Sequence, residues 1–248
     1  MTALILALIA GAVVGLMLGA LGGGSVLAVP ALIYLLGFTP ASATTASLII
    51  VTATSLTALY AHARAGRVRW KAGAAFAAAG ILPAAVAGAA SAHLPQAVLT
   101  LALAAVAALS ALKMLRPADT ARPKDGGVRP GKAAGAGAAL GTLTGLLGVG
   151  GGFLAVPALV TVLAFEMEAA VGTSLLVITA NSLASLATRS GTAASVDWAL
   201  IGPFIGTAIL GAWDGKRIAA KVSAPHLQRI FAVVLLAVAA FMLADAVT

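Results

Sequence analysis

Apolar residues dominate the chain in long uncharged runs, and the first of these runs is too long for one membrane helix. It extends for about 35 residues, from Ala3 to the turn signal at Gly37 to Pro40. A single helix crosses the hydrocarbon core with about 20 residues. The run contains the triplet Gly22–Gly24 and then Pro30, residue types that are unfavourable inside helices. The pattern therefore predicts an interrupted helix.

The interrupted pattern occurs twice. Residues 21–32 read LGGGSVLAVPAL and residues 148–159 read GVGGGFLAVPAL, with six consecutive identical residues at an offset of 127 positions. At the same offset, residues 46–59 match residues 173–186 with only apolar or small polar exchanges. This match indicates an internal duplication, which predicts two homologous membrane repeats.

A hydrophilic segment separates the two copies. Residues 113–132 contain three prolines and charges of both signs, which is typical of a linker. We expect an N-terminal transmembrane repeat at residues 1–115, a cytoplasmic linker at residues 116–132 and a C-terminal transmembrane repeat at residues 133–248. Each repeat has an interrupted helix pair and three spanning helices. The predicted fold is therefore an all-α polytopic membrane protein with 8 to 10 membrane segments.

The remaining runs give the expected helices. In the first repeat these are residues 3–21, 26–36, 40–60, 72–90 and 96–112, and in the second a broken segment at 133–165 followed by 169–188, 198–213 and 227–244. The helix after each interruption is rich in Ser and Thr. Gly11, Gly15 and Gly19 form a stripe that lets another helix approach closely. The sequence leaves open whether this stripe packs within one subunit or forms a homodimer.

Composition supports a membrane protein. The chain is 61% hydrophobic and 9% charged, with a mean hydropathy of +1.09, well outside the range of soluble domains. Its formal charge of +8 is confined to short connections between apolar runs, a pattern that indicates topology and not a nucleic-acid partner. There is no cysteine, which excludes disulfides, zinc–thiolate sites and thiol catalysis.

The distribution of Lys and Arg discriminates between two topologies. If each interrupted segment crosses once, the repeats are parallel, and four basic residues near the last helices lie outside. If each interrupted segment enters and returns, the repeats are inverted, and fourteen of the fifteen basic residues lie inside with Arg189 alone outside. The positive-inside rule therefore favours the inverted arrangement.

Matched helix interruptions indicate a transporter binding site. Broken backbone survives at membrane depth only where protein or a watery cavity covers it, and the first amides of a half-helix attract anions. No Asp, Glu, Lys or Arg lies in the middle of a predicted span, so an anion must be held by amides and hydroxyls. The backbone candidates are Gly22, Gly23, Gly24 and Ser25 in the first half and Gly150, Gly151 and Gly152 in the second.

Side chains on the two polar helices are further candidates. Ser47, Thr52 and Ser55 align with Ser174, Thr179 and Ser182. Such hydroxyls also commonly bond to carbonyls of their own helix, so both roles stay open. Asn181 aligns with Thr54 and is the one carboxamide deep in a span. Because an unpaired amide is costly in hydrocarbon, Asn181 belongs either to the site or to helix packing.

Near the ends of the polar helices lie His62 and Arg189, at equivalent positions. We expect His62 to be a solvated loop histidine. No spacing of His or carboxylates suggests a metal site, a cofactor or an enzyme nucleophile with its base. The leading interpretation is a secondary transporter that moves a small anion by alternating access, and a passive anion channel is the alternative.

At these residues the chain resembles the TauE/SafE family of sulfite and organosulfonate exporters. The resemblance includes the two Gly-rich, Pro-terminated segments, the Ser/Thr-rich helices and Trp70 and Trp198, which open the spans that follow. It implies a multi-pass permease of the bacterial inner membrane for small, often sulfur-containing anions. One departure is that five residues separate Gly24 from Pro30, whereas four separate Gly152 from Pro157. The pairing of glycines between the copies is therefore ambiguous.

Overall fold

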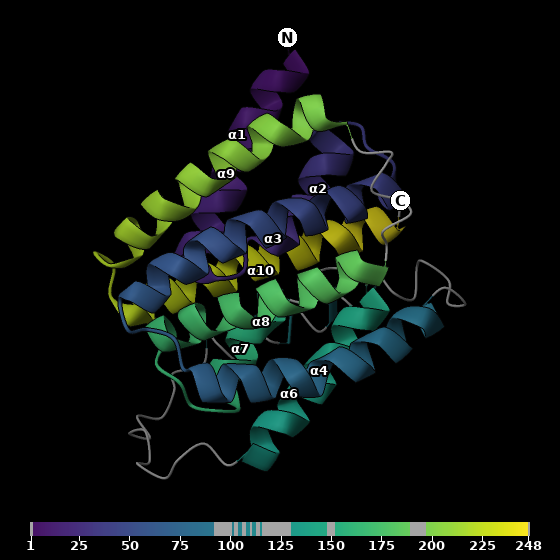
Figure 1. The fold of residues 1–248 in the computed structure, drawn as a ribbon. Coiled ribbons are helices and arrows are strands. Elements are labelled where there is room, and N and C mark those ends of the chain that lie inside the picture. The colour runs from purple at the N-terminus through teal and green to yellow at the C-terminus, as the bar shows by residue number, and fades with distance from the viewer. Residues whose placement is uncertain are drawn as a thin grey trace.

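The computed structural model describes residues 2–91, 130–147, 152–188 and 197–247, with scattered positions between 101 and 115. These residues form helices, and no strand occurs among them (Figure 1). The first half contains α1 (Thr2–Leu21), α2 (Ser25–Pro30), the π-helix η1 (Ala31–Leu35), α3 (Pro40–Arg64) and α4 (Trp70–Ser91). The second half contains α6 (Pro130–Leu147), α7 (Gly152–Thr161), α8 (Met167–Thr188), α9 (Trp198–Ala219) and α10 (Ala224–Val247).

Three of the described helices have the length and apolar composition of membrane spans. They are α1, the Thr45–Arg64 part of α3 and the Met167–Ala187 part of α8. The predicted all-α membrane fold is confirmed at this level. The predicted span at residues 96–112 lies largely outside the described residues.

Several helix ends differ from the sequence-based boundaries. α3 continues past Tyr60 to Arg64, and α9 continues past Trp213 to Ala219. In both cases the last turn is basic, with Lys or Arg side chains near the helix C-terminus, where they stabilise the helix dipole. Hydrophobicity alone therefore ended these helices too early. α6 begins at Pro130, inside the predicted linker.

The first glycine triplet breaks the helix as predicted. α1 ends at Leu21, Gly22 adopts a φ of 68°, and α2 begins at Ser25. Only glycine adopts this backbone conformation without strain. A Cβ atom on Gly24 would overlap backbone atoms of Val14 and Leu18, so the chain folds back against the last turns of α1.

Pro30 does not end the second part of the interrupted segment. The helix continues through it into η1. Proline has no amide proton and clashes with the carbonyl four residues earlier, and a wider π-turn is a known way for a helix to absorb such a fault. The chain then turns at Gly37, with a φ of 70°, before Thr39 caps α3 by accepting a hydrogen bond from the Ser42 amide.

The glycine stripe of α1 packs against α9 of the same chain. The successive pairs are Gly11 with Phe204, Gly15 with Ala208 and Gly19 with Ala212. Residue numbers rise together in both helices, so α1 and α9 run parallel. Because α9 covers the stripe, the stripe is not a surface for a second subunit.

Substitution of this stripe is expected to destabilise the fold. The added methyl group of Gly15→Ala would overlap the Ala208 carbonyl, and overpacking of this kind costs about 1–3 kcal/mol. Thermal unfolding in detergent should show a lower melting temperature. Gly206→Ala on α9 is the matched control, because no described atom lies within 4 Å of its added Cβ. An equal effect of both substitutions would argue against the close α1–α9 contact.

α4 and α6 form a second parallel pair with the same type of contact. Gly137 of α6 lies against the Phe76 backbone, and Gly141 lies against Gly80. Phe76 and Phe204, the aromatic residues at the two glycine contacts, are both fully buried. Each parallel pair therefore joins a helix of the first half to a helix of the second half.

The basic ends of several helices lie at one side of the molecule. The Nε2 atom of His62, in the last turn of α3, lies 3.3 Å from the Gly19 carbonyl oxygen near the end of α1. Lys216, near the end of α9, donates a hydrogen bond to the Ala61 carbonyl. After α3 ends, Arg67 forms a 3.2 Å ion pair with Glu168 in the first turn of α8. α3 and α8 therefore run antiparallel (Figure 1).

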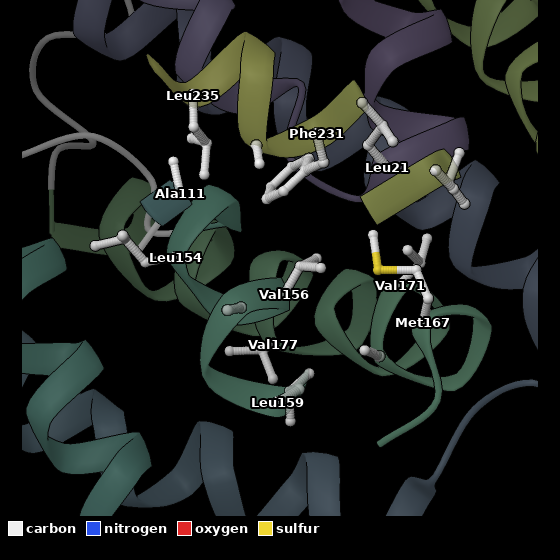
Figure 2. Close-up of a cluster of buried hydrophobic side chains, with 14 of the residues drawn as sticks. Leu21, Ala111, Leu154, Val156, Leu159, Met167, Val171, Val177, Phe231 and Leu235 are labelled. Atoms are coloured by element: carbon white, nitrogen blue, oxygen red, sulfur yellow. The ribbon is translucent and has the colours of Figure 1, made fainter. Parts of the chain in front are cut away.

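An apolar cluster connects the second half to the end of α1. Figure 2 shows Leu21 of α1, Val156 of α7, Val171 of α8 and Phe231 of α10 around a common interior, and all four are buried. Leu21 directly precedes the first glycine break. The break is therefore held against α7 and α8 by apolar packing.

Candidate functional site

α3 and α8 pack against each other, and both carry buried polar side chains. We call this set the polar seam, and it comprises Thr45, Ser47, Thr52, Thr54 and Ser55 of α3 with Thr173, Ser174, Thr179, Asn181 and Ser182 of α8. Each is less than 9% exposed. In a protein that spans lipid, such a concentration of buried polar groups requires internal partners or a polar solute.

A direct hydrogen bond links the two sides of the polar seam. The Ser55 and Thr179 hydroxyl oxygens are 2.9 Å apart. The Thr179 hydroxyl also donates to the Leu175 carbonyl at 2.8 Å. Since a hydroxyl has one proton, the two bonds are compatible when Ser55 donates to Thr179 in place of its 3.2 Å bond to the Thr52 carbonyl. The contact fixes the middle of α3 against the middle of α8.

Several of the seam hydroxyls donate their protons to their own helix. Thr52 donates to the Leu48 carbonyl at 2.7 Å, Thr54 to the Ile50 carbonyl at 2.6 Å and Ser174 to the Val171 carbonyl at 2.8 Å. This is the common behaviour of hydroxyl residues in membrane helices. In this conformation these side chains present oxygen lone pairs to the seam. To bind an anion, a hydroxyl would have to rotate its proton away from the carbonyl of its own helix and toward the seam.

Two seam side chains of α8 have unused hydrogen-bonding capacity. Asn181 Oδ1 and Ser182 Oγ are buried and have no hydrogen-bond partner among the described residues. A buried polar atom without a partner costs about 1–3 kcal/mol. Such a cost is typical of a position that a ligand or water occupies. Asn181 and Ser182 are therefore the strongest side-chain candidates in the seam.

The first glycine break lies against this polar helix of the other half. A Cβ atom on Gly22 would come within 2.5 Å of Ser174 Oγ and 3.0 Å of the Val156 side chain on α7. Gly22, Gly23 and Gly24 are all buried. α2 starts after Gly24 without a side-chain cap. The Leu27 amide donates to the Gly24 carbonyl, and the amides of Ser25 and Val26 precede the first bond of the helix. The break thus places backbone donors close to the seam.

Comparison with known proteins identifies the family of this chain. The sequence profile described as Sulfite exporter TauE/SafE matches residues 7–242. The chain belongs to this family. It is 34% identical to a "Probable membrane transporter protein" of Xylella fastidiosa strain 9a5c, covering 97% of this chain and 95% of the relative. A protein of the same description from strain Temecula1 is 32% identical, again over 97% and 95%. No solved structure matches the chain.

This TauE/SafE protein is therefore a multi-pass membrane transporter. The structure contains most of the site residues predicted from its sequence. Gly22, Gly23 and Gly24 form the break. Ser25 and Gly152 are the first residues of α2 and α7. The hydroxyl and amide candidates lie in the polar seam, namely Ser47, Thr52, Ser55, Ser174, Thr179, Asn181 and Ser182. Gly150 and Gly151 lie outside the described residues, so their proximity to the first break stays a prediction.

The expectation of a solvated His62 is wrong. Its side chain is 2% exposed in the last turn of α3, with Nδ1 lacking a partner among the described residues. The reason is that α3 continues to Arg64, so His62 remains in the helix and meets Gly19 of α1. The basic last turn of α3 was the available signal for this longer helix. Among the described residues, no group of three His, Asp or Glu side chains is arranged to hold a metal ion.

Proposed function

We propose that this transporter carries small anions by alternating access, with the anion held in the polar seam beside the first glycine break. The observation that carries this proposal is the close approach of Gly22 to Ser174, beside a seam in which the Asn181 oxygen lacks a partner among the described residues. Paired interruptions of membrane helices at the junction of two repeats are the usual location of substrate sites in secondary transporters. The absence of charged residues from the middle of the predicted spans favours a binding site made of uncharged groups.

We further propose that the two halves are inverted repeats related by a pseudo-two-fold axis. The contact of α1 with α9 corresponds to the contact of α6 with α4 when the halves are exchanged. Gly11 on Phe204 then matches Gly137 on Phe76. The turn before the polar helix is also repeated, since the Phe38 amide donates to Leu32 and the Phe165 amide donates to Leu159.

The axis would pass through the centre of the polar seam. Thr52 and Thr179 are equivalent positions in the two copies, and Thr179 bonds to Ser55. Because α3 and α8 are antiparallel, their crossing is then centred close to Thr54 and Asn181. Asn181, whose Oδ1 atom has no hydrogen-bond partner among the described residues, would therefore lie at the point where both halves contribute equally, which is where a single substrate site is expected.

The inverted arrangement is tested by thiol labelling. Thr39 and Glu166 are equivalent exposed positions, each just before the polar helix of its half. Because the natural chain has no cysteine, Thr39→Cys and Glu166→Cys each introduce one reactive thiol. In intact cells, an impermeant maleimide should label Thr39→Cys only, and Glu166→Cys should react only after the membrane is opened. Labelling of both from the same side would support parallel repeats.

The donors available to an anion are amides more than hydroxyls. The first amides of α2, those of Ser25 and Val26, supply two N–H groups and the favourable end of a helix dipole. The carboxamide of Asn181 presents its NH₂ group when it rotates by half a turn, because its two ends are nearly equal in shape. Sulfite and organosulfonates suit such a cradle, since their oxygens accept several hydrogen bonds at once. Export is the direction that the family description suggests.

Exchange in liposomes tests the proposed function. Protein reconstituted into vesicles loaded with unlabelled sulfite or sulfoacetate should accumulate the labelled anion transiently, and the initial rate should saturate with its concentration. The controls are empty vesicles, which contain no protein, and protein-containing vesicles loaded with choline chloride in place of the anion. A passive channel would give a rate that rises linearly with concentration and no stimulation by the internal anion. Either result would overturn alternating access.

A further inference from the structure

A basic cleft lies between the ends of α3 and α9, outside the polar seam. Its volume is about 360 Å³, and it extends along the last turns of both helices and the turn after α3. Four basic and two aromatic side chains line it, namely Arg64, Arg67, Lys216 and Arg217 with Tyr60 and Trp213. We call this feature the basic cleft. The proposed transport mechanism does not use it.

The basic cleft carries excess positive charge. Arg67 pairs with Glu168 at 3.2 Å and Arg217 pairs with Asp214 at 3.5 Å. Arg64 and Lys216 have no acidic partner among the described residues. The Arg64 guanidinium lies 5.1 Å from the centre of the Tyr60 ring, and Lys216 donates to the Ala61 carbonyl. Neither contact neutralises a charge, so the cleft retains two cations available to an anion.

The aromatic residues place the basic cleft at the surface of the bilayer. The apolar span of α3 ends at Arg64, and Tyr60 lies one turn before that end. Tyr60 is 57% exposed and Trp213 is 48% exposed. Exposed Tyr and Trp at the ends of membrane spans lie at the level of the lipid headgroups. A ligand of this cleft is therefore in contact with lipid and not only with water.

We propose that the basic cleft binds the phosphate of an anionic phospholipid from the adjacent leaflet. Basic pockets between membrane helices are suited to such headgroups, and the flanking aromatic rings offer apolar surface to the glycerol and the first acyl carbons. A free oxyanion would use the two cations but would gain nothing from the aromatic rings. The shared chemistry is a phosphate or a similar oxyanion, and the lipid is the source that the surroundings favour.

Lipid binding would connect the two halves of the transporter. Arg64 belongs to α3 and Lys216 belongs to α9, so one phosphate contacting both cations bridges the first half and the second. It would also offset the repulsion between Lys216 and Arg67. A ligand that binds the folded protein alone raises its melting temperature. The expected consequence is a protein stabilised by anionic lipid in particular.

Thermal unfolding of delipidated protein in neutral detergent tests this proposal. Phosphatidylglycerol should raise the melting temperature by several degrees in a saturable manner, and phosphatidylcholine should not. The variant Arg64→Gln, Lys216→Gln should lose most of this shift. The variant Lys221→Gln, Arg229→Gln removes the same charge from the beginning of α10 and the turn before it, outside the cleft, and should keep the shift.

Two further arms keep the result decisive. Arg64→Gln alone is included because Arg64 is exposed and its loss leaves the Lys216 bond to Ala61 intact; it should fold normally and reduce the shift. Inorganic phosphate at the same concentration as the lipid should have little effect. An equal shift with inorganic phosphate would assign the cleft to free anions and overturn the lipid proposal. An equal shift with phosphatidylcholine, or full retention in the Arg64→Gln variant, would also overturn it.

Discussion

Replacing Gly22 by alanine is expected to abolish anion exchange while the protein still folds and inserts. The added methyl group would lie 2.5 Å from Ser174 Oγ, at a residue whose φ is 68°. An L-residue in this left-handed conformation costs about 1–2 kcal/mol, and the overlap pushes the break away from α8. Initial rates of exchange in liposomes should fall to the level of empty vesicles, with the purified variant still monodisperse in detergent.

Gly37→Ala separates backbone strain from displacement of the break. Gly37 has a nearly identical φ of 70°, but no described atom lies within 4 Å of its added Cβ. This variant should lose only the stability that the backbone strain costs and should keep its exchange activity. Ser174→Ala in the Gly22→Ala background removes the overlapping hydroxyl and should restore part of the stability. If both glycine variants lose exchange equally, the contact between the break and α8 has no specific role in transport.

Asn181→Leu is expected to reduce exchange at least tenfold without lowering the melting temperature. Loss of one hydrogen bond to a charged ligand costs about 1.5–3 kcal/mol, and every 1.4 kcal/mol corresponds to about a factor of ten. Leucine has a similar size and removes a buried oxygen that lacks a partner among the described residues, so stability should stay constant or rise. Exchange rates and thermal unfolding, measured on the same preparation, check both parts.

Thr54→Val is the control for Asn181→Leu, because the two positions are equivalent in the duplicated sequence. The Thr54 hydroxyl donates to the Ile50 carbonyl of its own helix, so valine should preserve exchange. A lower melting temperature for Asn181→Leu, with exchange reduced only in proportion to folded protein, would instead make Asn181 a helix-packing residue.

The sequence was sufficient to predict the helix break and the two polar helices. Glycine at positions 22–24 is unfavourable in a helix. The repeated Ser/Thr pattern identifies α3 and α8 without any knowledge of the helices that pack against them. Helix ends were predicted less well, because His62 and Lys216 follow apolar runs and their polarity suggested loops. In the structure their helices continue, and the polar atoms bond to carbonyls of α1 and α3.

Partnerships between helices were not predictable from the pattern alone. The stripe of Gly11, Gly15 and Gly19 indicates a close neighbour, but only the three-dimensional arrangement identifies that neighbour as α9. The sequence also could not predict to which acceptors the Ser and Thr hydroxyls donate their protons. Thr52 and Thr179 are polar residues in a seam, yet their protons are used by their own helices, which moves the emphasis of the site to Asn181 and the amides of the break.

The central claim is that the anion binds at the polar seam, and anion-dependent thermal stabilisation of wild type and Asn181→Leu tests it most directly. Sulfite, sulfoacetate, sulfate and short carboxylates would each be titrated against both proteins at constant ionic strength. Our account predicts that at least one of them raises the melting temperature of the wild type in a saturable manner and that Asn181→Leu loses this shift. An undiminished shift in Asn181→Leu would contradict the account, because the anion would then bind elsewhere.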